Sequence, residues 1–213
     1  MEKIYLFTPG PTTLPPQVLQ AQSKPIIHHR TKEYAEVFEG MNKGLKYLFQ
    51  TENDVLTFAS SGTGAMEAAV VNTLSAGDKA LVVKGGKFGE RWAELCEVFG
   101  VEAVQVDTEW GEAVDPQVIR DRLKKDRGIK AVLTTLCETS TGTLTDISAI
   151  GEIVGKTDAL LIVDAVSGLG ADDMQTDTWG VEICVSGSQK GMMTPPGLAF
   201  CTVSKKAWKA EET

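Results

Sequence analysis

Seven short apolar runs, separated by segments with helical spacing, limit what this chain can fold into more than any other feature of its sequence. The runs cover residues 55–59, 80–84, 101–106, 130–136, 159–164, 182–187 and 198–203. Helical apolar spacing occurs over residues 65–74, 88–99, 116–123 and 147–154. Several runs are apolar at consecutive positions, as strands buried on both faces are. We therefore expect an α/β fold, a three-layer sandwich with a seven-stranded, mostly parallel sheet.

The first fifty residues do not follow this alternation. The segment TPGPTTLPP (residues 8–16) cannot join a central strand, because its prolines lack backbone N–H donors. We predict an extended arm followed by a helix over residues 32–49, and we assign residues 1–50 to this arm and helix and residues 51–213 to the large domain. Such an arm often lies across another surface, including that of a partner subunit.

Charge and cysteine usage exclude several classes of protein. The chain of 213 residues has a formal net charge of −8 and no Lys/Arg block, so neither nucleic acid nor an anionic membrane is expected as a partner. Its start has no signal peptide pattern and no apolar run reaches membrane-spanning length. We expect a cytoplasmic protein whose four widely separated cysteines are free thiols, with no metal site.

Polar residues after the strands identify candidate sites, because ligands of open α/β sheets bind outside the carboxyl ends of the strands. After residues 55–59 comes SSGTGAMEAA, in which Ser61, Gly62 and Thr63 lead directly into a helix. The backbone N–H groups of such a turn can bind phosphate. A simple helix cap by Ser61 or Thr63 is the alternative.

Three further strand ends carry polar residues. Asp164 ends a strongly apolar run, where a carboxylate needs a cation or donors unless it only caps a helix. The segment CETSTGTLTD after residues 130–136 can be explained by turn formation alone. Lys190 follows the next run, within SGSQKGMMTPPG. A phosphate-binding turn, a buried carboxylate and a lysine among small residues are the groups that hold pyridoxal phosphate.

The ordered motifs TPGPT, HHR, SSGTGAME, GGKFGERW, ETSTG, VDAVSGLG and SGSQKGMMTPPGL cover essentially the whole chain. In these motifs the sequence resembles the class V aminotransferases of pyridoxal-phosphate fold type I. Within them it is similar to the alanine–glyoxylate/serine–pyruvate aminotransferase group, which includes the soluble hydrogenase small subunit. The resemblance implies the large domain of this fold, pyridoxal 5'-phosphate as the cofactor and a homodimer.

The resemblance also implies roles for individual residues. Lys190 would form the Schiff base with the cofactor and later move a proton at the substrate Cα, and Asp164 would pair with the pyridine nitrogen. The other implied contacts are Ser61, Gly62, Thr63 and Gln189 at the phosphate, Thr139 at the ring hydroxyl, Phe88 and Val166 on the two ring faces, and Gly10 in the substrate pocket.

The resemblance further implies transamination of a small amino acid, alanine or serine, with glyoxylate or pyruvate. Chains of the family continue beyond Thr213 into a smaller domain that carries the arginine for the substrate carboxylate, so we expect this chain to hold most of the cofactor site and little of the substrate site. A cysteine desulfurase is one alternative, although such enzymes stack a histidine on the cofactor, and the only histidines here are His28 and His29 in the arm. A non-catalytic fragment or subunit is the other.

Overall fold

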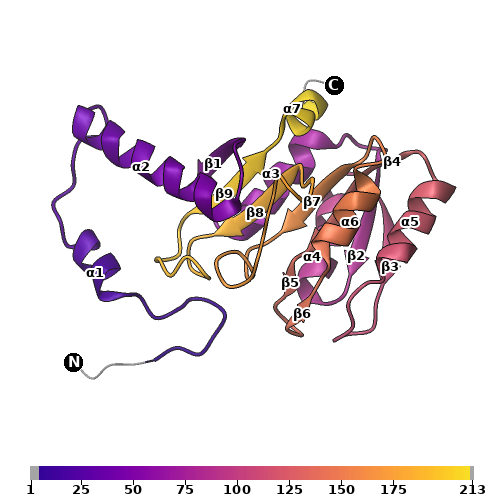
Figure 1. Ribbon diagram of the computed structural model, residues 1–213, viewed down its shortest axis with the longest axis horizontal. Helices are drawn as coiled ribbons and strands as arrows, with labels where there is room; N and C mark the ends of the chain where they lie inside the picture. The colour runs from indigo at the N-terminus through magenta and orange to yellow at the C-terminus, as the bar shows by residue number, and fades with distance from the viewer. Residues whose placement is uncertain (1–4, 212–213) are drawn as a thin grey trace.

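A computed structural model describes residues 5–211, and its centre is a single seven-stranded sheet (Figure 1). The strands follow the order β1-β9-β8-β7-β4-β2-β3. Only β9 runs antiparallel to its neighbours, so the other six strands share one direction. The predicted mostly parallel sheet is confirmed. Its strands are β1 (Asp54–Phe58), β2 (Lys79–Lys84), β3 (Glu102–Asp107), β4 (Ile129–Thr135), β7 (Leu160–Asp164), β8 (Ile183–Gly187) and β9 (Ala199–Val203).

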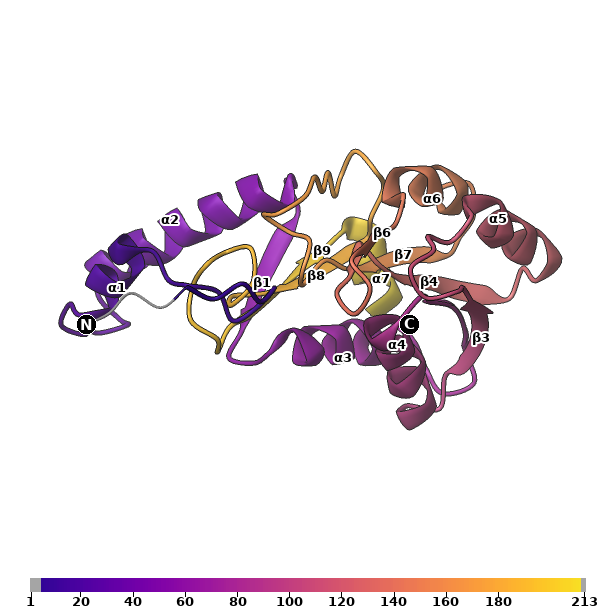
Figure 2. The same cartoon turned by 90° about the horizontal axis from the view of Figure 1, so that it is seen from below.

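Helices cover both faces of the sheet and complete the three layers (Figure 2). One face is covered by α3 (Gly62–Thr73), α4 (Lys87–Val98) and α7 (Lys205–Glu211). The opposite face is covered by α5 (Pro116–Lys125), α6 (Ile147–Val154) and the carboxyl end of α2 (Lys32–Phe49). Within the structure's range of residues 5–211, no helix is both long and apolar enough to cross a membrane.

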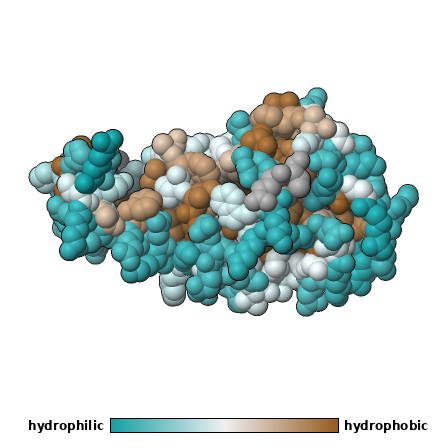
Figure 3. Space-filling view, turned by 90° about the horizontal axis from the view of Figure 1, so that it is seen from above, coloured by the Kyte–Doolittle hydropathy of each residue, from teal (hydrophilic) through white to brown (hydrophobic). Residues whose placement is uncertain are grey.

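The amino-terminal arm projects from this body. It contains α1 (Pro16–Gln22) and most of α2, of which only Leu45 and Phe49 are buried. The base of the arm is held by Asp177, whose carboxylate accepts hydrogen bonds from Thr51 Oγ1 at 2.6 Å, from the backbone N–H of residue 52 at 2.8 Å and from the side-chain amide of residue 53 at 2.9 Å. Apolar surface extends from the body toward the arm (Figure 3).

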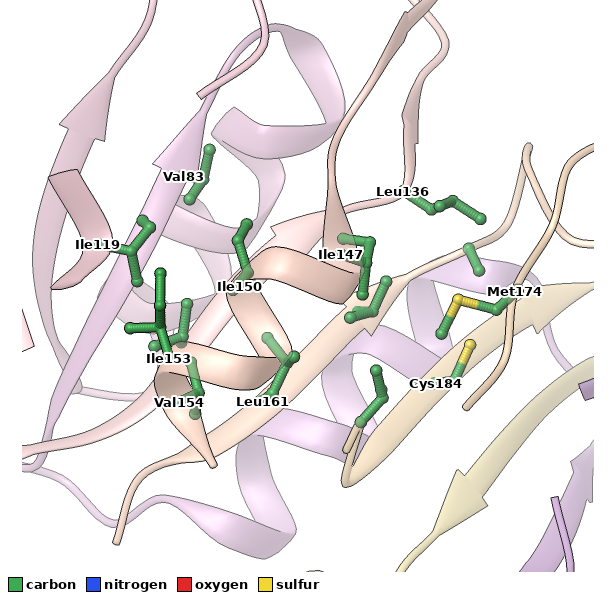
Figure 4. Close-up of a cluster of buried hydrophobic side chains, with 14 of the residues drawn as sticks. Val83, Ile119, Leu136, Ile147, Ile150, Ile153, Val154, Leu161, Met174 and Cys184 are labelled. Atoms are coloured by element: carbon green, nitrogen blue, oxygen red, sulfur yellow. The ribbon is translucent and has the colours of Figure 1, made fainter. Parts of the chain in front are cut away.

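The core lies on both sides of the sheet because neighbouring residues of the central strands point to opposite faces. In β4, Val132 packs on the α5/α6 side, whereas Ala131 and Leu133 pack on the α3/α4 side. The apolar side chains of α6, Ile147 and Ile150 among them, lie against the sheet in the first of these clusters (Figure 4). This double burial explains why the strands are continuously apolar in the sequence.

Two local elements differ from the predictions. Helix α1 interrupts the arm that we expected to be extended, and it begins at Pro16, where a missing N–H costs nothing in a first helical turn. A two-stranded hairpin of β5 (Cys137–Glu138) and β6 (Thr143–Leu144) follows β4 where we expected only a turn. Four residues between two-residue strands give no periodic signal, so sequence reasoning could not detect this hairpin.

Candidate active site

The predicted site residues meet at one edge of the sheet, where the carboxyl ends of the six co-directional strands lie. Strand β1 leads to the α3 turn, β2 leads to Phe88, and β4 leads to Thr139. The central strand β7 ends at Asp164, which lies opposite Val185 of β8, and the loop after β8 carries Lys190. The parallel sheet thus brings together residues that are up to 130 positions apart in the chain.

The N-terminus of α3 is open toward this edge. Ser61 is the N-cap residue, yet its side chain makes no capping hydrogen bond. Gly62 is buried against Val166, and a Cβ at position 62 would lie 2.6 Å from Val166 Cγ2. The glycine therefore allows the first turn of α3 to approach the loop after β7. The side chain of Ser61 and the positive end of the helix dipole are both available to an anion.

Asp164 is almost completely buried, at 2 % exposure. Its Oδ1 accepts the backbone N–H of Val166 at 2.8 Å, and no helix begins at this position, so Asp164 is not a helix cap. Burial raises the pKa of the Asp164 carboxyl to about 6, the Val166 hydrogen bond opposes this rise, and the Glu138 charge adds to it. A cationic nitrogen placed beside this carboxylate would relieve the cost of its burial.

Lys190 is partly buried below the amino-terminal arm. Burial lowers the pKa of the Lys190 amine, the Asp164 charge opposes this change, and the Arg91 charge adds to it. Gly10 of the arm lies directly on the lysine side chain, because a Cβ at Gly10 would overlap Lys190 Cδ and lie 2.8 Å from Cε. Thr12 Oγ1 also donates to the Lys190 carbonyl at 3.4 Å. The arm thus lies against the lysine of its own chain.

The segment around Phe88 is held by a buried carboxylate that we did not predict as a site residue. Glu138 Oε2 accepts the backbone N–H groups of Phe88 at 3.1 Å and Gly89 at 3.0 Å. Glu138 Oε1 accepts from Ser140 Oγ at 2.6 Å. These bonds satisfy the first N–H groups of α4 and thereby fix the position of Phe88.

Two further residues of this edge were missed. Ser167 Oγ is hydrogen-bonded to Thr139 Oγ1, the hydroxyl that we assigned to the cofactor ring. Arg91 lies one helical turn after Phe88, and its Nη1 donates to Thr63 Oγ1 at 3.0 Å. A spacing of three residues places two side chains on one face of a helix, so the spacing from Phe88 to Arg91 was the signal available in the sequence.

The residues at this edge fit pyridoxal phosphate by their chemistry. The open α3 terminus suits its phosphate, Asp164 suits a protonated ring nitrogen, and Lys190 is an amine with a depressed pKa. Gln189 Oε1 is buried and accepts no hydrogen bond in the part of the chain that the structure describes. Because an amide oxygen only accepts, a contact of Gln189 with phosphate would have to come from its side-chain N–H groups.

Comparison with known proteins finds relatives along the whole chain. A soluble hydrogenase small subunit from Synechococcus sp. (strain PCC 6716) is 46% identical over 100% of this chain and 56% of its own length. A serine–glyoxylate aminotransferase from Hyphomicrobium methylovorum is 42% identical over 95% of this chain and 51% of its own length. The crystal structure of an aspartate aminotransferase of subgroup IV from Thermus thermophilus superimposes with a TM-score of 0.91, at 36% identity, over 97% of this chain and 59% of the other.

The match to a protein family covers almost every residue of the chain. The chain spans only about half the length of the curated relatives it matches. The profile of the family "Aminotransferase class-V" nevertheless matches residues 4–212. The chain therefore belongs to the class-V aminotransferase family.

Proposed function

We propose that this protein is a pyridoxal 5'-phosphate-dependent aminotransferase that moves an amino group between a small amino acid and a small 2-oxo acid, through a Schiff base at Lys190. The observation that carries the proposal is the meeting of Lys190, Asp164 and the open N-terminus of α3 at one edge of the sheet. Bound cofactor would supply an electron-withdrawing ring that accepts the electrons of the broken Cα–H bond.

Each residue has a distinct task in this proposal. Asp164 keeps the ring nitrogen protonated, which the low-polarity environment of its carboxylate favours. Lys190 binds the cofactor covalently and then carries the proton removed from the substrate Cα, for which a depressed amine pKa is suitable. Ser61, Gly62, Thr63 and Gln189 hold the phosphate, Phe88 and Val166 enclose the ring, and Thr139 contacts its hydroxyl.

The substrates are proposed on the names of relatives together with the shape of the arm. The Hyphomicrobium relative is named for serine and glyoxylate, and the Thermus structure is named for aspartate. We propose alanine or serine as the amino donor and glyoxylate or pyruvate as the acceptor. The close packing of Gly10 on the Lys190 side chain supports a small substrate, because no side chain fits between the arm and the Cδ and Cε atoms of this lysine.

A desulfurase reaction is less well supported by the residues near Lys190. His28 and His29 stack on each other in the exposed arm, with ring centroids 4.7 Å apart, and Phe88 lies in the position proposed for stacking.

A second copy of this chain is the proposed partner of the arm, since Phe7 and Ile26 expose their side chains almost fully to solvent and Val37 of α2 is 59 % exposed.

An amino-donor screen tests the proposed function. The protein expressed from its whole reading frame is incubated with cofactor, with glyoxylate or pyruvate, and with alanine, serine, aspartate or cysteine in turn. We expect glycine to form from glyoxylate with alanine or serine as donor, and alanine to form from pyruvate with serine as donor, and we expect Lys190→Ala to abolish both reactions. Release of sulfide from cysteine, with no transamination by any donor, would show that the chemistry is that of a lyase instead.

A further inference from the structure

Arg91 joins two segments of the candidate site that belong to different strands of the sheet. Its Nη1 donates a 3.0 Å hydrogen bond to Thr63 Oγ1 in the first turn of α3. Its guanidinium carbon lies 5.0 Å from the centroid of the Phe88 ring, one turn earlier on α4. One side chain therefore touches both the segment proposed for the phosphate and the ring proposed for stacking.

The partly buried guanidinium forms no salt bridge among residues 5–211, although its positive charge lowers the pKa of the Asp164 carboxyl. Its neighbour Glu90 is already paired with Lys87, whose Nζ lies 2.6 Å from Glu90 Oε2. The contacts of Arg91 are thus a neutral hydroxyl and a neutral ring, beside the positive end of the α3 dipole. A partly buried cation with no directly bound anion is stabilised further when an anion binds to it.

The hydrogen bond from Arg91 also determines what Thr63 can do. A hydroxyl has one hydrogen to donate and lone pairs to accept with. Because Thr63 Oγ1 accepts from the guanidinium, its own hydrogen is free to donate to a ligand. A hydroxyl polarised by a cation is a stronger donor to an anion than an isolated one.

The same contact affects the Phe88 ring. The guanidinium lies over one face of the ring, and the backbone N–H of Phe88 is held by Glu138. These two contacts restrain the ring, and a planar ligand would have to stack on the face that the guanidinium does not occupy.

We propose that Arg91 is a positioning residue for the phosphate of the cofactor: it orients the Thr63 hydroxyl toward a phosphate dianion at the N-terminus of α3, contributes positive charge there, and holds Phe88 in the stacking position. This inference rests on the proposed function, because it takes the phosphate of pyridoxal phosphate as the anion.

The test compares the binding of pyridoxal phosphate with that of pyridoxal, which lacks the phosphate. Dissociation constants are measured by absorbance titration for wild type, Arg91→Gln and Arg91→Lys. Arg120→Gln is the matched control, since it removes the same charge from an exposed position of α5. We expect Arg91→Gln to weaken pyridoxal phosphate binding about tenfold or more. Pyridoxal binding should change far less, and Arg91→Lys and Arg120→Gln should retain most of the preference for the phosphorylated ligand.

A second variant keeps the inference testable if Arg91→Gln does not fold. Thr63→Val removes the hydroxyl and keeps the side-chain shape, so it should reduce the preference for pyridoxal phosphate over pyridoxal as Arg91→Gln does. Adding Arg91→Lys to Thr63→Val should reduce that preference little further. An equal loss for both ligands would assign Arg91 a structural role and overturn the inference. A wild-type protein that binds neither ligand would instead overturn the proposed function, which distinguishes the two failures.

Discussion

Asp164→Asn is expected to make the cofactor-free protein more stable while it makes the enzyme slower. Burial raises the pKa of the Asp164 carboxyl from 3.8 to about 6. The folded state therefore keeps a proton that the unfolded state loses between these two pH values, and the free energy of unfolding falls as pH rises through this window. Such a pKa shift corresponds to roughly 3 kcal/mol of the free energy of unfolding, and this contribution is lost once the pH exceeds the folded-state pKa.

The substitution removes this cost and keeps the local hydrogen bond. The carbonyl oxygen of asparagine can still accept the Val166 N–H that Asp164 Oδ1 accepts at 2.8 Å. We therefore expect the free energy of unfolding of the cofactor-free variant, measured relative to wild type, to be roughly 3 kcal/mol higher above pH 7 than below pH 4. Transamination should slow by about ten- to a hundredfold, because an amide provides no negative charge for the ring nitrogen.

Urea unfolding of the two cofactor-free proteins at intervals from about pH 3 to about pH 8 measures the difference in free energy of unfolding. Asp158→Asn is the control, because Asp158 is exposed in the loop before β7. The reasoning is wrong if the difference between wild type and Asp164→Asn does not grow as pH rises, or if the variant keeps its full kcat.

Three further substitutions test the remaining parts of the site. Lys190→Ala should abolish activity and the covalent attachment of cofactor that borohydride reduction fixes in wild type, as measured by mass spectrometry, with little change in Tm. Cofactor still attached in this variant would show that the Schiff base forms at another lysine. Gly10→Ala should lower kcat/KM by about tenfold or more, since its Cβ would overlap Lys190 Cδ. Gly40→Ala, where a Cβ meets nothing within 4 Å, should leave kcat/KM unchanged; equal effects would refute the role of the arm. Glu138→Gln should lower the free energy of unfolding by about 1–3 kcal/mol, because its amide would face the N–H donors of Phe88 and Gly89. Asp146→Asn should cost much less in the same denaturation experiment, because asparagine caps helices as well as aspartate does.

The sheet could be predicted from the sequence because its signal is local and repeated. Continuous apolar runs such as residues 159–164 are too short for helices in an α/β chain and too apolar for strands with a solvated face. The helix predicted over about residues 32–49 and the helical spacing over residues 147–154 coincide with α2 and α6. Helix α1 and the β5–β6 hairpin were not predicted, since neither is long enough to show a periodic pattern.

Lys190 and Asp164 could be selected as candidates from the sequence because their residue types are unusual after apolar strands. The sequence by itself also determined which strand ends carry polar groups. Once the sheet is parallel, those ends must lie at one edge, so the general location of the site required no coordinates.

Only the tertiary structure decided which of these groups touch one another. The contact of Arg91 with Thr63 depends on how α4 packs beside α3, and the close approach of Gly10 to Lys190 depends on the path of the arm. The hydrogen bond from the Phe88 N–H to the Glu138 carboxylate likewise joins residues 50 positions apart. Sequence patterns report periods along one element, whereas these contacts are set by the distance and orientation between elements, which the packing of the whole chain determines.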